Sequence, residues 1–236
     1  DGQPINFKKA RRFTRSEMMV MEMLSTNEWK RPMYFATTVG SDYHLGLDPY
    51  LELTGMAYRI TPTRSADGRP RVNTEVMYDN MMNKFRYGNV NKPGIYLDEN
   101  TLRMCRTHRM MFSELAEALY EEGKHDKAIA VLDYAEEMLP GYNVSYDYTS
   151  ASMAALYYTL GEMEKGNAIM DQVATNAVEY MEWGTTLEPA SRKAAQSTLG
   201  HYSAVLGFVL NNLQRFEQKE LFNKYEAFGG DVEELK

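Results

Sequence analysis

Polar side chains that could carry chemistry are few and scattered along this chain. Asp42, His44 and Asp48 lie close together in one predicted loop and are ligand types that a divalent cation takes. Solvation of a polar loop accounts for them equally well, so we expect neither a metal nor another cofactor. No glycine-rich phosphate loop and no nucleophile motif is present, and paired carboxylates such as Glu121 and Glu122 fit acidic helix faces. The sequence therefore predicts a chain without catalytic residues.

Tyrosines and glutamates on predicted helices are better suited to binding than to catalysis. A tyrosine offers a large apolar ring and a hydroxyl at low entropic cost, and neighbouring glutamates attract a basic segment. The predicted partner-binding groove contains Glu117, Tyr120, Glu121, Tyr148, Tyr158 and Tyr202. Tyr120 and Tyr158 hold equivalent positions in two helical units, so we expect their rings to stand side by side. The alternative is that these tyrosines pack against neighbouring loops.

A second candidate set lies near the amino terminus. These are possible contacts for a carbohydrate or a lipid head group, namely Arg31, Tyr34, Tyr58 and Arg59. A basic cluster precedes them, formed by Lys8, Lys9, Arg11, Arg12 and Arg15. This cluster could touch acidic lipid or phosphate, or it could be a solvated segment facing an acidic part of the chain.

The elements that position the groove residues are helices in pairs. Residues 111–140 fit two amphipathic helices around a turn at Gly123, and a second pair fits around Gly161. The predicted packing positions are Phe112, Leu115, Ala116, Leu119, Ala128, Leu132 and Ala135 in the first pair, and Met153, Ala154, Tyr157, Gly166, Met170 and Val173 in the second. This pattern resembles tetratricopeptide repeats, which stack into solenoids that bind peptides and proteins. A third pair is predicted at 188–211 and 214–228, with Glu217 where the repeat has alanine.

The amino-terminal third reads as a small α/β segment. We expect a helix from a Ser16 cap to about residue 26, strands at 33–39 and 56–61, and a short helix at 50–53 between them. The two strands would form a parallel pair, followed by a helix at 73–85. Asp98 is a good cap for a long helix. The predicted domains are therefore 1–95, a small α/β segment, and 96–236, a helical repeat domain, in a mainly α fold.

Composition restricts the classes of partner. The net charge is −7, and residues 111–236 hold 9 Lys+Arg against 21 Asp+Glu, which disfavours nucleic acid. No stretch has the apolar length of a membrane span or the pattern of a signal peptide, and we expect a fragment of a longer protein. The single cysteine, Cys105, is expected to be a buried, inert thiol. Asn143-Val144-Ser145 matches a glycosylation sequon, a short and common motif.

Five segments in order carry a further resemblance: NEWKRPMYFA at 27–36, LGLD at 45–48, YRITP at 58–62, MYDNMMNKF at 77–85 and YLDEN at 96–100. Together they resemble the carboxy-terminal soluble region of a Bacteroidetes membrane-protein family. The amino-terminal half of that family spans the membrane several times and is similar to GT-C glycosyltransferases and protein O-mannosyltransferases. The resemblance implies that the catalytic half lies outside this chain and that this part is on the periplasmic side of a bacterial inner membrane.

Two hypotheses of function follow. In the first, this is a noncatalytic domain that binds an acceptor or partner protein through the tyrosine groove, beside the membrane half of the same polypeptide. In the second, it is an auxiliary carbohydrate- or head-group-binding domain acting through the amino-terminal segment. A purely structural role, supporting the membrane half, is a further alternative.

Overall fold

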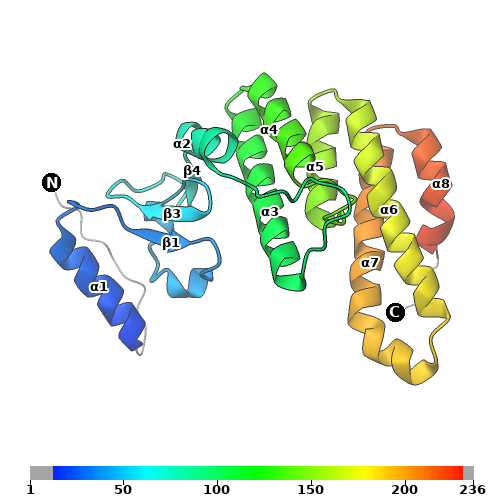
Figure 1. Cartoon of the computed structure of the whole chain (residues 1–236), viewed down its shortest axis with the longest axis horizontal. Helices are drawn as coiled ribbons and strands as arrows, with labels where there is room; N and C mark the ends of the chain where they lie inside the picture. Colours follow the sequence, from blue (N-terminus) through cyan, green and yellow to red (C-terminus); the bar gives the residue numbers. More distant parts are fainter. Residues whose placement is uncertain (1–12, 231–236) are drawn as a thin grey trace. The chain divides into compact units, whose positions relative to one another are not determined.

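The computed structural model describes residues 13–230, which fall into two compact units. The first unit extends to Arg86 and the second begins at Tyr87, and each is described by itself (Figure 1). The division comes earlier than the predicted boundary at residue 95 because the intervening loop packs on the helices. The Tyr87 ring lies 5.6 Å from that of Phe112, and the Asn143 amide donates hydrogen bonds to the carbonyls of Val90 and Lys92.

The first unit consists of a helix packed on a small sheet. Its elements are α1 (Arg15–Asn27), β1 (Tyr34–Ala36), 3₁₀ helices at Ser41–Tyr43 and Asp48–Tyr50, β2 (Leu51–Leu53), β3 (Ala57–Ile60), β4 (Arg71–Val72), α2 (Thr74–Tyr78) and a π-helical segment at Asp79–Lys84. Among the described residues the strand order is β1-β3-β2-β4. Thr14, and not the predicted Ser16, caps α1, because its hydroxyl accepts from the Glu17 amide while the Thr14 amide donates to the Glu17 carboxylate.

The predicted parallel pair of strands is wrong. β1 pairs antiparallel with β3, and β3 pairs antiparallel with β2, the segment that the sequence suggested was a helix. The segment between the two predicted strands contains β2 and not a crossover helix, and the turn from Leu53 to Ala57, closed by hydrogen bonds from Thr54 to the Ala57 carbonyl, reverses the chain direction before β3. Gly55 allows this turn, with φ of 137°.

The core of the first unit is a cluster of leucine and isoleucine side chains. Leu45, Leu47, Leu51 and Ile60 are buried, and Val20, Met21 and Leu24 of α1 pack against them. Three methionines of α1 lie outside this core. Met18, Met19 and Met23 are 59%, 64% and 47% exposed because they lie on the side of the helix away from this cluster.

The second unit is a series of helical hairpins, which confirms the mainly α class. Its helices are α3 (Glu99–Glu121), α4 (His125–Met138), α5 (Tyr148–Thr159), α6 (Met163–Thr185), α7 (Pro189–Arg215) and α8 (Lys219–Gly230). Asp98 caps α3 as predicted. All the predicted packing residues of the first two hairpins are buried, and so is Cys105, whose thiol pKa is raised by that burial. No helix within residues 13–230 is long and apolar enough to cross a membrane.

The same backbone turn closes each of the three hairpins formed by the described residues. Gly123 and Gly161 have φ of 74° and 88°, and Glu217 takes the equivalent place with φ of 58°. In each turn the following amide donates back into the helix, as in the 2.8 Å bond from Gln218 to the Leu213 carbonyl. Glu217 is therefore the turn residue of the third hairpin, and its predicted place as a packing position is wrong.

A buried arginine holds the loop that links α4 to α5. Arg109 of α3 has no exposed surface and donates hydrogen bonds of 3.0, 2.7 and 2.7 Å to the carbonyls of Ser145, Leu139 and Val144. Its guanidinium also lies 5.2 Å from the centre of the Tyr146 ring, whose hydroxyl donates to the Glu136 carboxylate. These hydrogen bonds and the contact between the guanidinium and the ring hold the loop in place. They replace the hydrogen bonds that the same groups would make to water in the unfolded chain.

We expect Glu136 to make stability depend on pH. Burial raises the pKa of its carboxyl, although the Tyr146 hydroxyl opposes this shift. The folded state then binds this proton more tightly than the unfolded state, so the free energy of unfolding falls as pH rises from the ordinary carboxyl pKa through the raised one. Glu136→Gln should remove this loss, which urea unfolding at about pH 4, 6 and 8 will measure. Glu137→Gln, at an exposed neighbouring position, should keep the wild-type slope, and equal slopes for all three proteins would contradict the assignment.

Candidate functional site

The first helices of the three hairpins line a groove of about 470 Å³. We name it the α3–α5–α7 groove, and its lining residues are Ser113, Glu117, Tyr120, Glu121, Ser152, Ala155, Leu156, Thr159, Phe208, Asn212, Arg215 and Phe216. The lining positions of each helix recur at the three- and four-residue spacing of one helix face. The lining mixes apolar side chains, such as Leu156 and Phe208, with polar and charged ones.

Three of the predicted groove residues line this groove, and they are Glu117, Tyr120 and Glu121. The Tyr120 ring is half-buried and stacks on His125 at 5.1 Å, so one of its faces is already covered. Tyr148 is 48% exposed, and its ring lies 4.7 Å from that of Phe208 in a tilted arrangement; Phe208 itself lines the groove. The two glutamates are exposed on α3, and Arg215 of α7, also exposed, lies over the Phe216 ring at 5.2 Å.

The structure contradicts the prediction for Tyr158. Its side chain is only 2% exposed, its hydroxyl donates to Asn167 at 2.7 Å and its ring packs on Phe216 at 5.1 Å. The reason is Gly166, which lets α6 approach so closely that the Tyr158 ring fills the place of a side chain. Tyr120 and Tyr158 therefore do not form an open pair of rings, and Tyr158 joins the second hairpin to the third.

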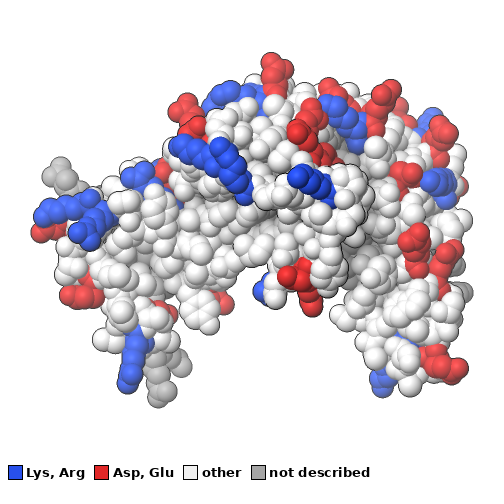
Figure 2. Space-filling model, in the orientation of Figure 1, with Lys and Arg blue, Asp and Glu red and all other residues white. Residues whose placement is uncertain are grey.

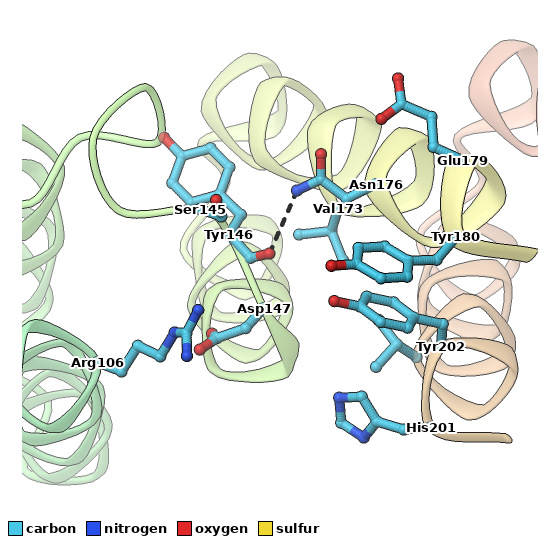
Figure 3. Close-up of a pocket in the computed structure, with 11 residues that line it drawn as sticks. Arg106, Ser145, Tyr146, Asp147, Val173, Asn176, Glu179, Tyr180, His201 and Tyr202 are labelled. Atoms are coloured by element: carbon cyan, nitrogen blue, oxygen red, sulfur yellow. Dashed lines mark hydrogen bonds between the residues drawn. The ribbon is translucent and has the colours of Figure 1, made fainter. Parts of the chain in front are cut away.

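A second cavity, of about 440 Å³, opens at the amino-terminal end of α5 (Figure 3). We name it the α5 cavity. Arg106 of α3 lines one side, the segment Ser145 to Asp147 lines another, and α6 and α7 supply the rest, including Tyr180, His201 and Tyr202. Tyr202, the remaining predicted groove residue, lies here. The cavity exists because α5 has 12 residues whereas α6 and α7 have 23 and 27, so the longer helices extend past the start of α5.

Two stacked tyrosines dominate the α5 cavity. The rings of Tyr180 and Tyr202 lie 4.0 Å apart and within 10° of parallel, and Figure 3 shows both hydroxyls directed into the cavity. Burial, together with the adjacent Tyr180 hydroxyl, raises the pKa of Tyr202 to about 12. The Tyr202 phenol is therefore neutral near pH 7, and it can both donate and accept a hydrogen bond.

The candidate residues of the first unit do not form one site. Tyr34 and Arg59 are register partners on β1 and β3 and both are exposed. Tyr58 lies on the opposite face of the sheet, where it packs against the leucine cluster, because successive strand residues alternate between faces. Arg31 is exposed in the segment before β1 and is not one of the register partners. Tyr34 and Arg59 remain predicted ligand contacts on one face of the sheet. Tyr58 cannot join them because it lies on the other face.

Two of the three residues in the candidate cation loop, His44 and Asp48, contact each other within the fold. His44 is buried and its Nδ1 lies 3.0 Å from the Asp48 carboxylate, with the rings of Phe35 and Tyr58 against it. Asp42 is exposed. No group of three or more metal-ligating side chains occurs in the part of the chain that the structure describes.

The glycosylation sequon is also part of the packing. The Asn143 amide donates to the carbonyls of Val90 at 2.6 Å and Lys92 at 2.7 Å, and Val144 is buried. A glycan on that nitrogen would break both bonds, so the sequon is a structural element of this loop.

The comparisons with known proteins bear on the first unit. Residues 3–80 match a family described as TMEM260-associated domain 2. The searches of curated proteins and of solved structures found no match. The matched stretch contains in full three of the five segments that carry the resemblance, at 27–36, 45–48 and 58–62, so this part of the chain is similar to that family. The helical unit, which contains both cavities, lies outside the match.

Proposed function

We propose that this chain is a noncatalytic, periplasmic part of a membrane glycosyltransferase-like protein, and that its tetratricopeptide-like helical unit binds an acceptor or partner polypeptide. TMEM260 is an O-mannosyltransferase-like protein, so the family match supports the link to glycosyl transfer. The ordered segments that resemble a bacterial membrane-protein family support the compartment. The catalytic half would belong to the membrane-spanning part of the same polypeptide.

The observation that carries the binding function is the α3–α5–α7 groove. One helix from each hairpin contributes to it, so a bound segment would contact the whole unit and not one helix pair. Its apolar lining includes Leu156, Phe208 and Phe216, whereas Glu117 and Glu121 of α3 are exposed. Such a groove takes a segment that combines apolar side chains with basic ones, the basic ones facing α3.

Helix geometry specifies the spacing of those basic side chains. Glu117 and Glu121 are one turn apart, so their Cβ atoms are separated by roughly 5–6 Å. In an extended peptide, side chains two residues apart point the same way and are separated by about 6.8 Å. A peptide with lysines at positions i and i+2 therefore matches the two carboxylates best.

The test is binding of labelled eight-residue peptides to the 236-residue chain, measured by fluorescence anisotropy. One pool has lysine fixed at positions i and i+2, and the matched pool has glutamate there. We expect binding from the lysine pool only. Glu117→Lys/Glu121→Lys should weaken that binding by about tenfold, since two exposed ion pairs are lost and replaced by repulsion.

A matched control separates the groove from overall charge. Asp126→Lys/Glu137→Lys changes the net charge equally at exposed positions of α4 and should bind as the wild type does. Equal loss in both double variants would mean that net charge attracts the peptides. Absence of binding from both pools, or binding from the glutamate pool alone, would contradict the proposal and favour a supporting role for the membrane half.

A further inference from the structure

The α5 cavity is lined mainly by side chains that make hydrogen bonds. Arg106, Asp147, Asn176, Tyr180, His201 and Tyr202 bring such groups from separate walls, and the aliphatic lining is limited to Val173 and Val205. A volume of about 440 Å³ is within the range of sites for small molecules. An apolar ligand would leave most of these polar groups without partners, at a cost of about 1–3 kcal/mol for each buried group.

The charges of the α5 cavity favour a ligand without net charge. Figure 3 shows the Arg106 guanidinium reaching toward Asp147 on one side, whereas the Glu179 carboxylate points away from the tyrosine hydroxyls. One cation and one anion thus face the interior, and neither sign is in excess there. A phosphate would meet the Asp147 carboxylate, and an amine would meet the Arg106 guanidinium.

Several of the polar groups are held in place before any ligand enters. Asp147 caps α5 and accepts from the Ser150 amide, and the Asn176 amide donates to the Tyr146 carbonyl at 3.4 Å. The Tyr180 and Tyr202 rings fix one another by stacking. Donors and acceptors that are already oriented lower the entropy cost of binding a polar molecule.

The Tyr180 ring has a further aromatic neighbour. Trp183, one turn along α6 from Tyr180, meets that ring nearly edge-on at 6.2 Å and is 46% exposed. The stacked rings of Tyr180 and Tyr202 line the cavity together with fixed hydrogen-bonding groups, and this combination suits a molecule with C–H groups and a rim of hydroxyls. We infer that the α5 cavity binds a carbohydrate through the hydroxyls of Tyr180 and Tyr202, with Arg106 and Asp147 on the opposite wall. This inference does not depend on peptide binding in the α3–α5–α7 groove.

The test uses the 236-residue chain and four neutral disaccharides: maltose, lactose, α-1,2-mannobiose and chitobiose. Saturation-transfer-difference NMR identifies the ligand, and calorimetric titration measures its affinity. We expect saturable binding of at least one disaccharide. Tyr202→Phe keeps the ring and removes one hydroxyl, so affinity should fall about fivefold. Arg106→Ala/Tyr202→Phe should lower it by at least tenfold.

Controls distinguish this site from the rest of the surface. Arg103→Ala/Tyr96→Phe makes the same changes outside the cavity, at two exposed positions, and should leave affinity unchanged. All variants should show wild-type helicity by circular dichroism. Binding of no disaccharide, or equal affinities for the wild type and Arg106→Ala/Tyr202→Phe, would overturn the inference.

A final titration distinguishes a carbohydrate that is linked to a protein from a free one. A peptide O-linked to the preferred disaccharide is titrated beside the same bare peptide and the free disaccharide. Tighter binding of the glycopeptide would support a protein-linked ligand, and equal binding of the glycopeptide and the free disaccharide would support recognition of the sugar alone. Binding of the bare peptide in the cavity, lost in Tyr202→Phe, would overturn the carbohydrate assignment in favour of a polypeptide.

Discussion

Replacing Gly166 by alanine is expected to destabilise the helical unit by about 1–3 kcal/mol, although alanine favours helices. A Cβ atom at this position would lie 2.5 Å from Cδ1 of Tyr158 and 3.1 Å from the carbonyl oxygen of Ala154. The Tyr158 ring is buried against Phe216 and its hydroxyl is bonded to Asn167, so it has no free space into which to turn. Urea unfolding followed by circular dichroism will measure the change.

Gly200→Ala is the matched control for this prediction. Gly200 also lies within a long helix, α7, but a Cβ atom there would meet nothing within 4 Å. Helix propensity should therefore act alone and stabilise the variant by up to about 1 kcal/mol. The close approach of α5 and α6 would be refuted if Gly166→Ala were as stable as Gly200→Ala.

Arg109→Met is expected to cost at least about 3 kcal/mol, because three carbonyls, two of them buried and one partly buried, would lose a charged donor at once. The Leu139, Val144 and Ser145 carbonyls lie in the loop between α4 and α5, and each accepts a hydrogen bond from the Arg109 guanidinium. Methionine fills much of the same volume, so the effect measures the lost hydrogen bonds more than a cavity. The same urea titration measures it.

Arg103→Met is the control on the same helix. Arg103 is exposed and bonds to Asn100 one turn away, so its replacement should change stability by no more than about 0.5 kcal/mol. If the two methionine variants were equally stable, the loop would be held by its own contacts and not by Arg109. Because Asp147 ends this loop and lines the α5 cavity, Arg109→Met should also weaken ligand binding there.

The helical unit was largely predictable because its signals are local. Amphipathic spacing located the helices, and Gly123 and Gly161 marked two turns that need positive φ. The third turn was predicted too early, between residues 211 and 214, because Glu217 adopts the turn conformation without being glycine and no local signal marks it. The strand at Leu51–Leu53 was missed for a similar reason, since three residues are too few for a pattern and its neighbours in the sheet decide its state.

The candidate sites were less predictable than the helices. Repeat equivalence placed Glu117, Tyr120 and Glu121 in the groove, but the same equivalence put Tyr158 there, where the closeness of Gly166 buries it. The α5 cavity depends on the unequal lengths of α5, α6 and α7, and on side chains from segments as distant as Arg106 and Tyr202. The buried state of Arg109 likewise depends on a loop some thirty residues away, as its hydrogen bonds show.

The sequence by itself determined the mainly α class, the paired helices with their packing faces, two of the turns and the acidic side chains of the groove. Periodicity, capping residues and glycine act over a few residues, so they can be read along the chain. Only the tertiary structure decided which tyrosines are exposed, where α5 leaves a cavity and what Arg109 binds. Those outcomes depend on how closely separate helices approach, a distance that no single stretch of sequence contains.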